Sequence, residues 1–190
     1  MIFQPTPWRG LNVLLAAMQM IENKNIKLDV YSSTQVYGDA FKEANDDKWV
    51  PLYKQASELP NVNYIGYRPN QYILENLQNY HIFAYPSIWE ETSCISAIEC
   101  MSAGLYSIVT NYGALYETCS EFPIYVQYLQ DYKLLAKSFA TAIDIAADTL
   151  HLDVIQSNLD MQQEFYKRFY SWEKQADTWS NFLRGVTNVK

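Results

Sequence analysis

The sequence predicts an α/β fold with a doubly wound parallel sheet and helices on both of its faces. Short apolar runs alternate with longer segments of helical periodicity along the 190 residues. The strand-like runs are separated by helical segments, and such crossovers join parallel strands. Hydrophobic residues make up 49% of the chain and charged residues 18%, so the chain contains enough apolar material to bury a core.

The expected strands lie at residues 2–4, 27–31, 62–66, 81–85, 106–110 and 123–127. The expected helices lie at 8–22, 48–57, 70–79 and 94–102, followed beyond residue 131 by helices that end near 147, 168 and 186. Thr6 is expected to cap the first of these helices, with Pro7 in its first position, and Asn70 to cap its own helix. We expect residues 1–190 to form one domain.

Charge and composition exclude several classes of function. The net charge of -7 repels phosphate backbones and anionic lipids, so nucleic acid is not an expected partner. The three cysteines and two histidines follow no metal-binding spacing, so no metal site is expected. No signal peptide and no apolar run long enough to cross a bilayer is visible in the sequence. We therefore expect a soluble, cytoplasmic protein.

The segment 86–104, PSIWEETSCISAIECMSAG, is the most informative for chemistry. Thr92 or Ser93 can cap the helix that follows, and the free amides at its start suit a diphosphate. Glu99 then lies about 9 Å further along the helix axis, where a carboxylate could accept hydrogen bonds from a ribose. Glu91 precedes the helix and is placed to meet the sugar on the other side. The same helix start could lower the pKa of Cys94.

This segment resembles the glutamate-seven-glutamate signature of family 4 retaining glycosyltransferases. Further segments before and after it also resemble the family, in the family's order and along nearly the whole chain. They are TPWRGLNVLLAAM, LPNVNYIGYRPNQYILENLQNYHIFAYPS, TNYGALYET and FYSWEKQADTW. The resemblance implies a Rossmann-like domain, the C-terminal half of the two-domain B-type fold, which binds the nucleotide sugar.

The resemblance also assigns roles to individual residues. Arg9 corresponds to the family's phosphate-binding cation and Glu91 to its first glutamate, and these are the expected catalytic residues. The other expected donor-binding residues are Glu99, Thr92, Ser93, Cys94, Gly66, Tyr67, Arg68 and Gly113, with 66–68 contacting the base. Two departures stand out. Gln4 replaces a second arginine, and Thr92-Ser93-Cys94 replaces a glycine-rich turn, which leaves the sugar preference open.

The implied reaction is hexosyl transfer with retention from a UDP-, GDP- or ADP-sugar, without a metal or other cofactor. The glycan acceptor would be held by an N-terminal domain that this chain does not contain, so the chain is expected to be inactive alone. The C-terminal helix, about 168–190, would reach toward that domain or pair with a second copy. Trp8 and Trp89 fall in ligand-facing loops. The open alternatives are a non-catalytic binding or scaffold module and another enzyme of this fold, such as an epimerase or phosphorylase.

Overall fold

The computed structural model describes residues 1–187 and contains a six-stranded parallel sheet with the order β3-β2-β1-β4-β5-β6. Its strands are β1 (Ile2–Phe3), β2 (Leu28–Val30), β3 (Val62–Tyr64), β4 (Ile82–Tyr85), β5 (Tyr106–Thr110) and β6 (Ile124–Val126). Each predicted strand is found within two residues of its expected bounds. The central strands β1, β4 and β5 are buried throughout, as strands covered on both faces must be. The predicted fold class is confirmed.

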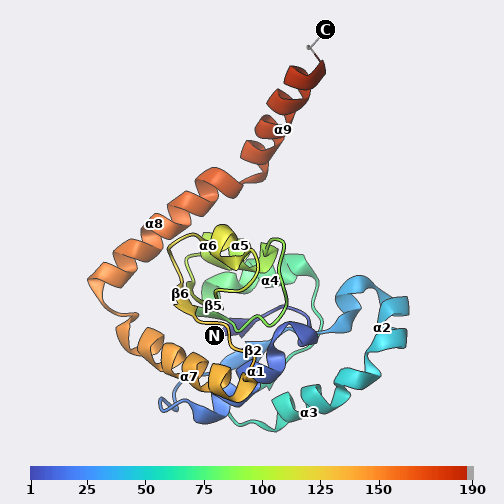
Figure 1. Ribbon diagram of the computed structural model, residues 1–190, viewed down its shortest axis with the longest axis vertical. Coiled ribbons are helices and arrows are strands. Elements are labelled where there is room, and N and C mark those ends of the chain that lie inside the picture. The colour runs from blue at the N-terminus through green and yellow to red at the C-terminus, as the bar shows by residue number, and fades with distance from the viewer. Residues whose placement is uncertain (188–190) are drawn as a thin grey trace.

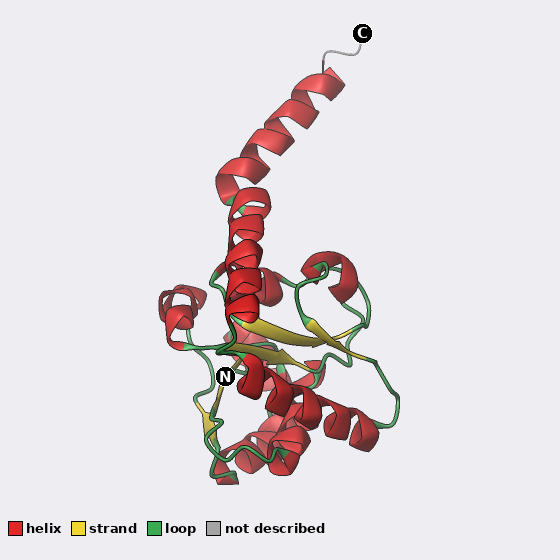
Figure 2. Ribbon diagram, turned by 90° about the vertical axis from the view of Figure 1, so that its left-hand side faces the viewer, coloured by secondary structure: helices red, strands yellow, loops and turns green. Residues whose placement is uncertain are grey.

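Helices cover both faces of this sheet (Figures 1 and 2). The helices are α1 (Leu11–Met20), α2 (Asp39–Asn45), α3 (Val50–Glu58), α4 (Asn70–Asn76), α5 (Ile95–Ser102), α6 (Leu115–Cys119), α7 (Tyr132–Thr149), α8 (Asp153–Tyr170) and α9 (Trp172–Thr187). Helix α1 packs against α3 and α7 on one face, and α5 packs against α6 and α8 on the other. Short 3-10 turns stand at η1 (Pro7–Arg9), η2 (Thr34–Tyr37), η3 (Asp47–Trp49) and η4 (Leu77–Asn79).

The direction of strand addition reverses between β1 and β4. The chain first adds β2 and β3 on one side of β1, and then adds β4, β5 and β6 on the other side. Because α1 follows β1 onto one face and α5 follows β4 onto the opposite face, the loops after these two strands diverge. Ligands of doubly wound sheets bind at such a switch point, outside the carboxyl ends of the strands.

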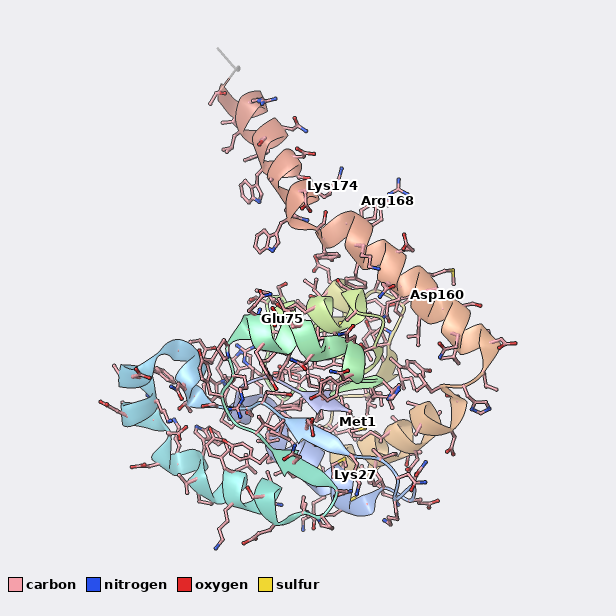
Figure 3. The ribbon with its side chains drawn as sticks, turned by 180° about the vertical axis from the view of Figure 1, so that it is seen from behind. Met1, Lys27, Glu75, Asp160, Arg168 and Lys174 are labelled. Atoms are coloured by element: carbon pink, nitrogen blue, oxygen red, sulfur yellow. The ribbon has the colours of Figure 1, made fainter. Side chains whose placement is uncertain are left out.

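Helix α8 is fastened to the body by buried polar side chains. The amide of Gln162 donates to the carbonyl oxygens of Met101 and Leu105 at 3.1 and 3.0 Å, and the Tyr166 hydroxyl donates to that of Thr118 at 2.7 Å. Helix α9 then extends away from the body, and its labelled Lys174 stands clear of the sheet (Figure 3). Among residues Trp172–Thr187 no side chain is buried. The last residues of the expected C-terminal helix, 188–190, lie outside the described residues.

The first predicted helix is interrupted. Gly10 adopts a φ of +117° and separates the 3-10 turn η1 from α1. Pro7 begins η1, as expected, but the Thr6 side chain makes no capping hydrogen bond within the described residues. The prediction of a continuous helix capped by Thr6 is therefore wrong. The reason is that the backbone must turn at Gly10 to pass the loop after β4.

Two other local predictions also need correction. Pro69 is the N-cap of α4, and Asn70 is its first helical residue, so the side chain of Asn70 is free to bond elsewhere. The segment 34–47 has no expected element, yet it forms η2, α2 and the start of η3. Helix α2 contains no buried residue among Asp39–Asn45, and a helix without an apolar stripe carries no periodic signal.

Candidate functional site

The switch point brings Arg9 and Glu91 into contact. Arg9 ends the turn after β1, Glu91 lies in the loop after β4, and Arg9 Nη1 donates to Glu91 Oε1 in an ion pair. Glu91 is 5% exposed, and the hydroxyl of Tyr85 donates to the same oxygen. Burial opposes the charge of Arg9, but the hydrogen bond and the charge of Glu91 outweigh it, so the pKa of Arg9 is raised. The Arg9 guanidinium is therefore ionised at neutral pH.

Glycines allow the loops around this pair to touch. A β-carbon on Gly10 would lie 2.1 Å from the carbonyl oxygen of Pro86. Gly113, at a φ of +59°, has the Glu91 backbone 2.5 Å from the position of its missing β-carbon. The amide of Ala114 then donates to the Glu91 carbonyl oxygen at 2.7 Å. The absence of a side chain at Gly113 therefore lets the loop after β5 hold the Glu91 backbone in place.

Thr92, Ser93 and Cys94 connect Glu91 to helix α5. Thr92 and Ser93 are exposed, and Cys94 is the N-cap, without a side-chain capping bond in the described part of the chain. The expectation that Thr92 or Ser93 caps this helix is wrong, which leaves the first-turn amides of α5 without a side-chain cap. Burial raises the pKa of the Cys94 thiol to about 12, although the Ala97 amide acts in the opposite direction. The expectation that the helix start lowers this pKa is also wrong, because burial dominates.

A groove runs from this pair along the carboxyl edge of the sheet. One cavity of about 350 Å³ is lined by Arg9, Glu91 and all three residues that connect Glu91 to α5. A second cavity, of about 280 Å³, is lined by Tyr67, Arg68 and Asn70. Both cavities share the lining residues Gln4, Val36 and Ser96, so they adjoin. The groove therefore joins most of the residues that the sequence singled out.

Gln4 stands at the middle of the groove. Its amide nitrogen donates to the Ser96 carbonyl oxygen at 3.3 Å. Its own oxygen, Oε1, is buried and has no donor within residues 1–187. Gln4 thus connects the end of β1 to the first turn of α5, and it brings no positive charge to the place where the family often has arginine.

Glu99 lies one turn beyond Ser96 on α5 and is half-buried. The side-chain amide of Asn70 donates to Glu99 Oε1 at 2.9 Å, which ties α4 to α5 at the end of the groove. Burial raises the pKa of Glu99, and the bond from Asn70 lowers it in part. Glu99 itself does not line either cavity in the described structure, whereas its partner Asn70 does.

The loop after β3 forms the far wall of the groove. Gly66 adopts a φ of +72°, Tyr67 is 38% exposed, and the Arg68 guanidinium donates back to the Tyr67 carbonyl oxygen at 2.8 Å. Arg68 therefore braces its own loop in this structure.

Sequence reasoning missed Tyr85 and Asn70 as supports of the two glutamates. Tyr85 reads as one more apolar strand residue, and only its place directly before Pro86 at the end of β4 could have drawn attention to it. Asn70 was read as a helix cap, a role that concealed its reach across to α5.

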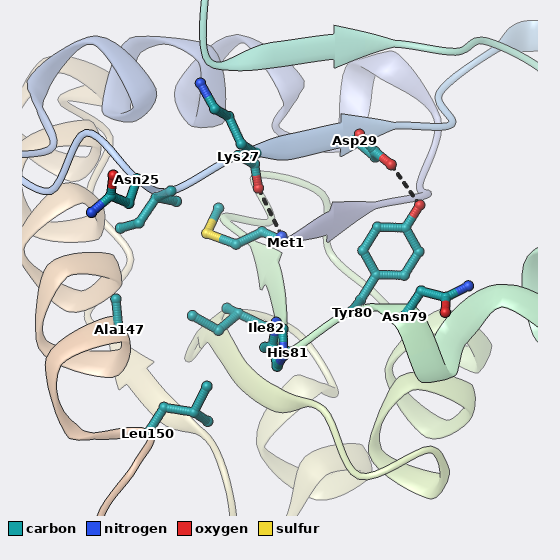
Figure 4. A pocket seen from close by; sticks show the side chains of 11 residues that line it. Met1, Asn25, Lys27, Asp29, Asn79, Tyr80, His81, Ile82, Ala147 and Leu150 are labelled. Carbon is teal, nitrogen blue, oxygen red and sulfur yellow. Dashed lines mark hydrogen bonds between the residues drawn. The ribbon is translucent and has the colours of Figure 1, made fainter.

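Another cavity lies beside Met1, at the amino edge of the sheet (Figure 4). It measures about 460 Å³, and it is bordered by Met1, whose amine donates to the Lys27 carbonyl oxygen at 2.7 Å. Asp29 accepts from the Tyr80 hydroxyl at 2.7 Å on its other side. This cavity contains none of the residues that the sequence predicted for the site.

Across residues 1–187, no three His, Cys, Asp or Glu side chains are grouped so as to hold a metal ion. None of the helices described has the length and apolar character required to cross a membrane.

Comparisons with known proteins agree with this geometry. The chain is similar to a glycosyltransferase from Rickettsia africae, with a TM-score of 0.75 and 16% identity over 100% of this chain and 48% of that one. Sucrose-phosphate synthase from Thermosynechococcus elongatus gives a TM-score of 0.73 and 19% identity over 100% and 46%. HepE from Anabaena, solved with UDP-glucose, gives 0.66 and 18% over 95% and 48%.

At these identities the structural similarity establishes the fold, and the chain spans about half the length of the structures it matches. A comparison with curated proteins gave no match. Residues 3–148 match the family described as glycosyl transferases group 1. Since this match covers more than half of the chain, the protein belongs to the glycosyl transferases group 1 family.

Proposed function

We propose that this chain is the donor-binding half of a retaining glycosyltransferase and that its groove binds a nucleotide diphosphate sugar. The observation that carries the proposal is the Arg9–Glu91 ion pair at the switch point, beside the uncapped start of α5. A cation, a set of free amides and a carboxylate on one groove suit a ligand that contains both phosphates and a sugar.

The diphosphate would lie between Arg9 and the first turn of α5. Among the guanidinium nitrogens of Arg9, only Nη1 is hydrogen-bonded to the described residues, so most of the guanidinium donors can turn to phosphate oxygens. The helix amides add about half a positive charge. The leaving diphosphate gains negative charge as the glycosidic bond breaks, and these fixed donors would stabilise that charge without a metal ion.

The sugar would lie against Glu91. Its Oε1 accepts from both Arg9 and Tyr85, while Oε2 has no donor within the described residues and is left for a sugar hydroxyl. Because the carboxylate is held by two donors and by the close backbone contact of Gly113, its position is set before the ligand binds. Such preorganisation favours one orientation of the sugar.

The nucleoside would occupy the far end of the groove. Glu99, with Asn70, would bind the ribose hydroxyls, and the loop of Gly66, Tyr67 and Arg68 would border the base. Reaching the ribose requires Glu99 to turn from its present bond to Asn70 or to share it. HepE is solved with UDP-glucose, which makes UDP-sugars the first donors to test here.

The chain alone would bind its donor and transfer nothing. The structures it matches are about twice its length, and a B-type enzyme places its acceptor on the other half. The exposed apolar face of α9 would then pack on that half or on a second copy of this chain. Without the other half, the main alternative is a non-catalytic module that binds nucleotides or serves as a scaffold.

Calorimetric titration with UDP, GDP, ADP and UDP-glucose tests the proposal. We expect one nucleoside diphosphate to bind and the matching sugar nucleotide to bind in the same site by competition. If none of these nucleotides binds at the highest practical concentration, the donor-site assignment is wrong and the scaffold alternative is favoured.

A further inference from the structure

A second pocket opens directly beside the groove, on the other side of Arg9. It measures about 430 Å³ and is lined by the aromatic side chains of Trp8, Tyr37, Phe41, Trp49 and Trp89. These rings come from three distant segments of the chain. We call this the aromatic pocket. Its volume lies in the range of about 300–1,000 Å³ that is typical of small-molecule sites.

The rings that form this pocket are unusually accessible. Tyr37 is 52% exposed, Phe41 37% and Trp89 48%. Trp8 stacks on Tyr37 with centroids 6.0 Å apart and a 17° angle between planes, and it also contacts the rings of Phe41 and Trp49. A cluster of this size in contact with water is what a binding surface requires and a monomer's ordinary surface avoids.

Helix α2 contributes Phe41 to one wall of this pocket. It has no buried residue among Asp39–Asn45, and its main packing partners are the neighbouring turns η2 and η3. In Figure 1 it lies at the edge of the molecule, away from the sheet. Phe41 on this helix packs on Trp8 and so connects α2 to the body. The core of the fold therefore gains little from this segment, whereas the pocket depends on it.

Polar donors border the aromatic faces. Arg9 lies over the Trp89 ring at 5.8 Å, and Lys48 over the Trp49 ring at 5.7 Å. Flat apolar faces beside hydrogen-bond donors suit a pyranose ring, which has apolar C–H faces and a rim of hydroxyls. A purely apolar chain would leave these donors unused.

We propose that the aromatic pocket binds one sugar ring of the acceptor. Arg9 and Tyr37 line both this pocket and the groove, so a sugar in the pocket would adjoin the position given to the donor's sugar. The inference rests on the proposed donor site, and it adds that the donor half itself contributes to acceptor recognition. Stacking on ring faces tolerates many sugars, so several pyranosides should bind weakly.

Nuclear magnetic resonance of the isotope-labelled full chain tests this directly through the tryptophan indole N–H signals. The probes are the methyl glycosides of glucose, galactose, mannose and N-acetylglucosamine, each with and without UDP. We expect shifts at Trp8, Trp49 and Trp89, while Trp172 and Trp179 on α9 serve as internal references. Pentanol is the comparison probe for an apolar ligand.

Two variants sharpen the result. Phe41→Ala removes a wall of the pocket from a helix without buried residues, and Phe169→Ala removes an exposed phenylalanine on α8. Phe41→Ala should weaken glycoside binding at least several-fold and leave UDP binding unchanged, and Phe169→Ala should change neither. The proposal is overturned if no glycoside shifts the pocket signals, if pentanol alone does, or if Phe41→Ala has no effect. Absence of UDP binding would instead reject the proposed function.

Discussion

Arg9 and Glu91 are 82 positions apart in the sequence, yet their charges meet at the one place where the sheet reverses its order of strands. The pair compensates its own charge, because the guanidinium neutralises a carboxylate that is 5% exposed. It also places a donor and an acceptor for a ligand next to each other. This arrangement leads to specific expectations for each partner.

Replacing Arg9 by alanine should weaken UDP binding by about 10- to 100-fold, since hydrogen bonds to charged groups contribute about 1.5–3 kcal/mol. Calorimetry of Arg9→Ala against Arg184→Ala measures this, because Arg184 lies on α9 and away from the groove. Glu91 would keep only its bond from Tyr85, so stability should also fall, by about 1–3 kcal/mol. Equal UDP affinities in the two folded variants would remove Arg9 from the phosphate site.

Replacing Glu91 by glutamine should distinguish the contribution of the sugar to binding affinity from the contribution of the phosphates. An amide oxygen can still accept from Tyr85 and Arg9, so the fold should persist. Affinity for UDP should be unchanged or higher, because a negative charge beside the phosphates is lost. The ratio of the affinity for UDP-sugar to the affinity for UDP should fall by about fivefold, because the hydrogen bond from the sugar to residue 91 loses its charge and about 1 kcal/mol. A large loss of affinity for UDP itself would contradict this assignment.

The raised pKa of Glu99 predicts a pH dependence. Burial shifts it above its ordinary 4.5, so the folded chain binds this proton more tightly than the unfolded chain does. This carboxyl therefore lowers stability as pH rises through the window above 4.5. Nucleotide binding should show the opposite pH dependence, because the ribose hydroxyls need the ionised carboxylate of Glu99 as acceptor. Affinity for UDP should therefore fall as pH drops through the raised pKa of Glu99. Titrations of UDP binding against pH should show this step in the wild type and lose it in Glu99→Gln.

Gly10→Ala should destabilise the protein much more than Gly38→Ala. Both glycines have positive φ, +117° and +95°, so both variants place an alanine in a sparsely populated backbone region, which costs about 1–3 kcal/mol. Only at Gly10 would the new β-carbon also meet backbone, 2.1 Å from the Pro86 oxygen, whereas Gly38 has nothing within 4 Å. Thermal unfolding of the two variants compares them, and similar melting temperatures would mean that the loops after β1 and β4 can separate without cost.

The sequence predicted the strands from their apolar runs, and the family resemblance assigned Arg9 and Glu91 to one catalytic site. Apolar runs separated by helices require a parallel sheet, and a parallel sheet brings the ends of its strands together at one edge. The topology also indicated the loops after residues 66 and 85, whereas the donor-binding roles of Thr92 to Cys94 and of Gly66 to Arg68 were implied by the resemblance. These predictions depend on patterns that are local in the sequence.

The predictions that proved wrong concern side chains whose surroundings are set by residues far away in the chain. Thr6 and Asn70 are good capping residues by type, but the Gly10 turn and the contact with Glu99 decide their surroundings. Cys94 stands at a helix start, which favours a thiolate, yet its burial is the larger effect and only packing reveals it. Helix α2 has no apolar stripe, so periodicity could not find it.

Helix α9 should cause self-association of the chain when it is studied alone. Trp172, Trp179 and Val186 recur at seven-residue spacing and are 88%, 61% and 57% exposed, which gives α9 a continuous apolar stripe. Large exposed stripes of this kind mark contact surfaces. Analytical ultracentrifugation should therefore show dimers whose share grows with concentration.

The double variant Trp172→Gln and Trp179→Gln should be monomeric and as stable as the wild type, because none of Trp172–Thr187 is buried. Val154→Gln with Met161→Gln is the matched control, since these α8 side chains are also exposed, at 71% and 60%, but lie off the α9 stripe. A wild-type chain that stays monomeric at every concentration would refute self-association through α9. Its apolar stripe would then be left for the acceptor-binding half.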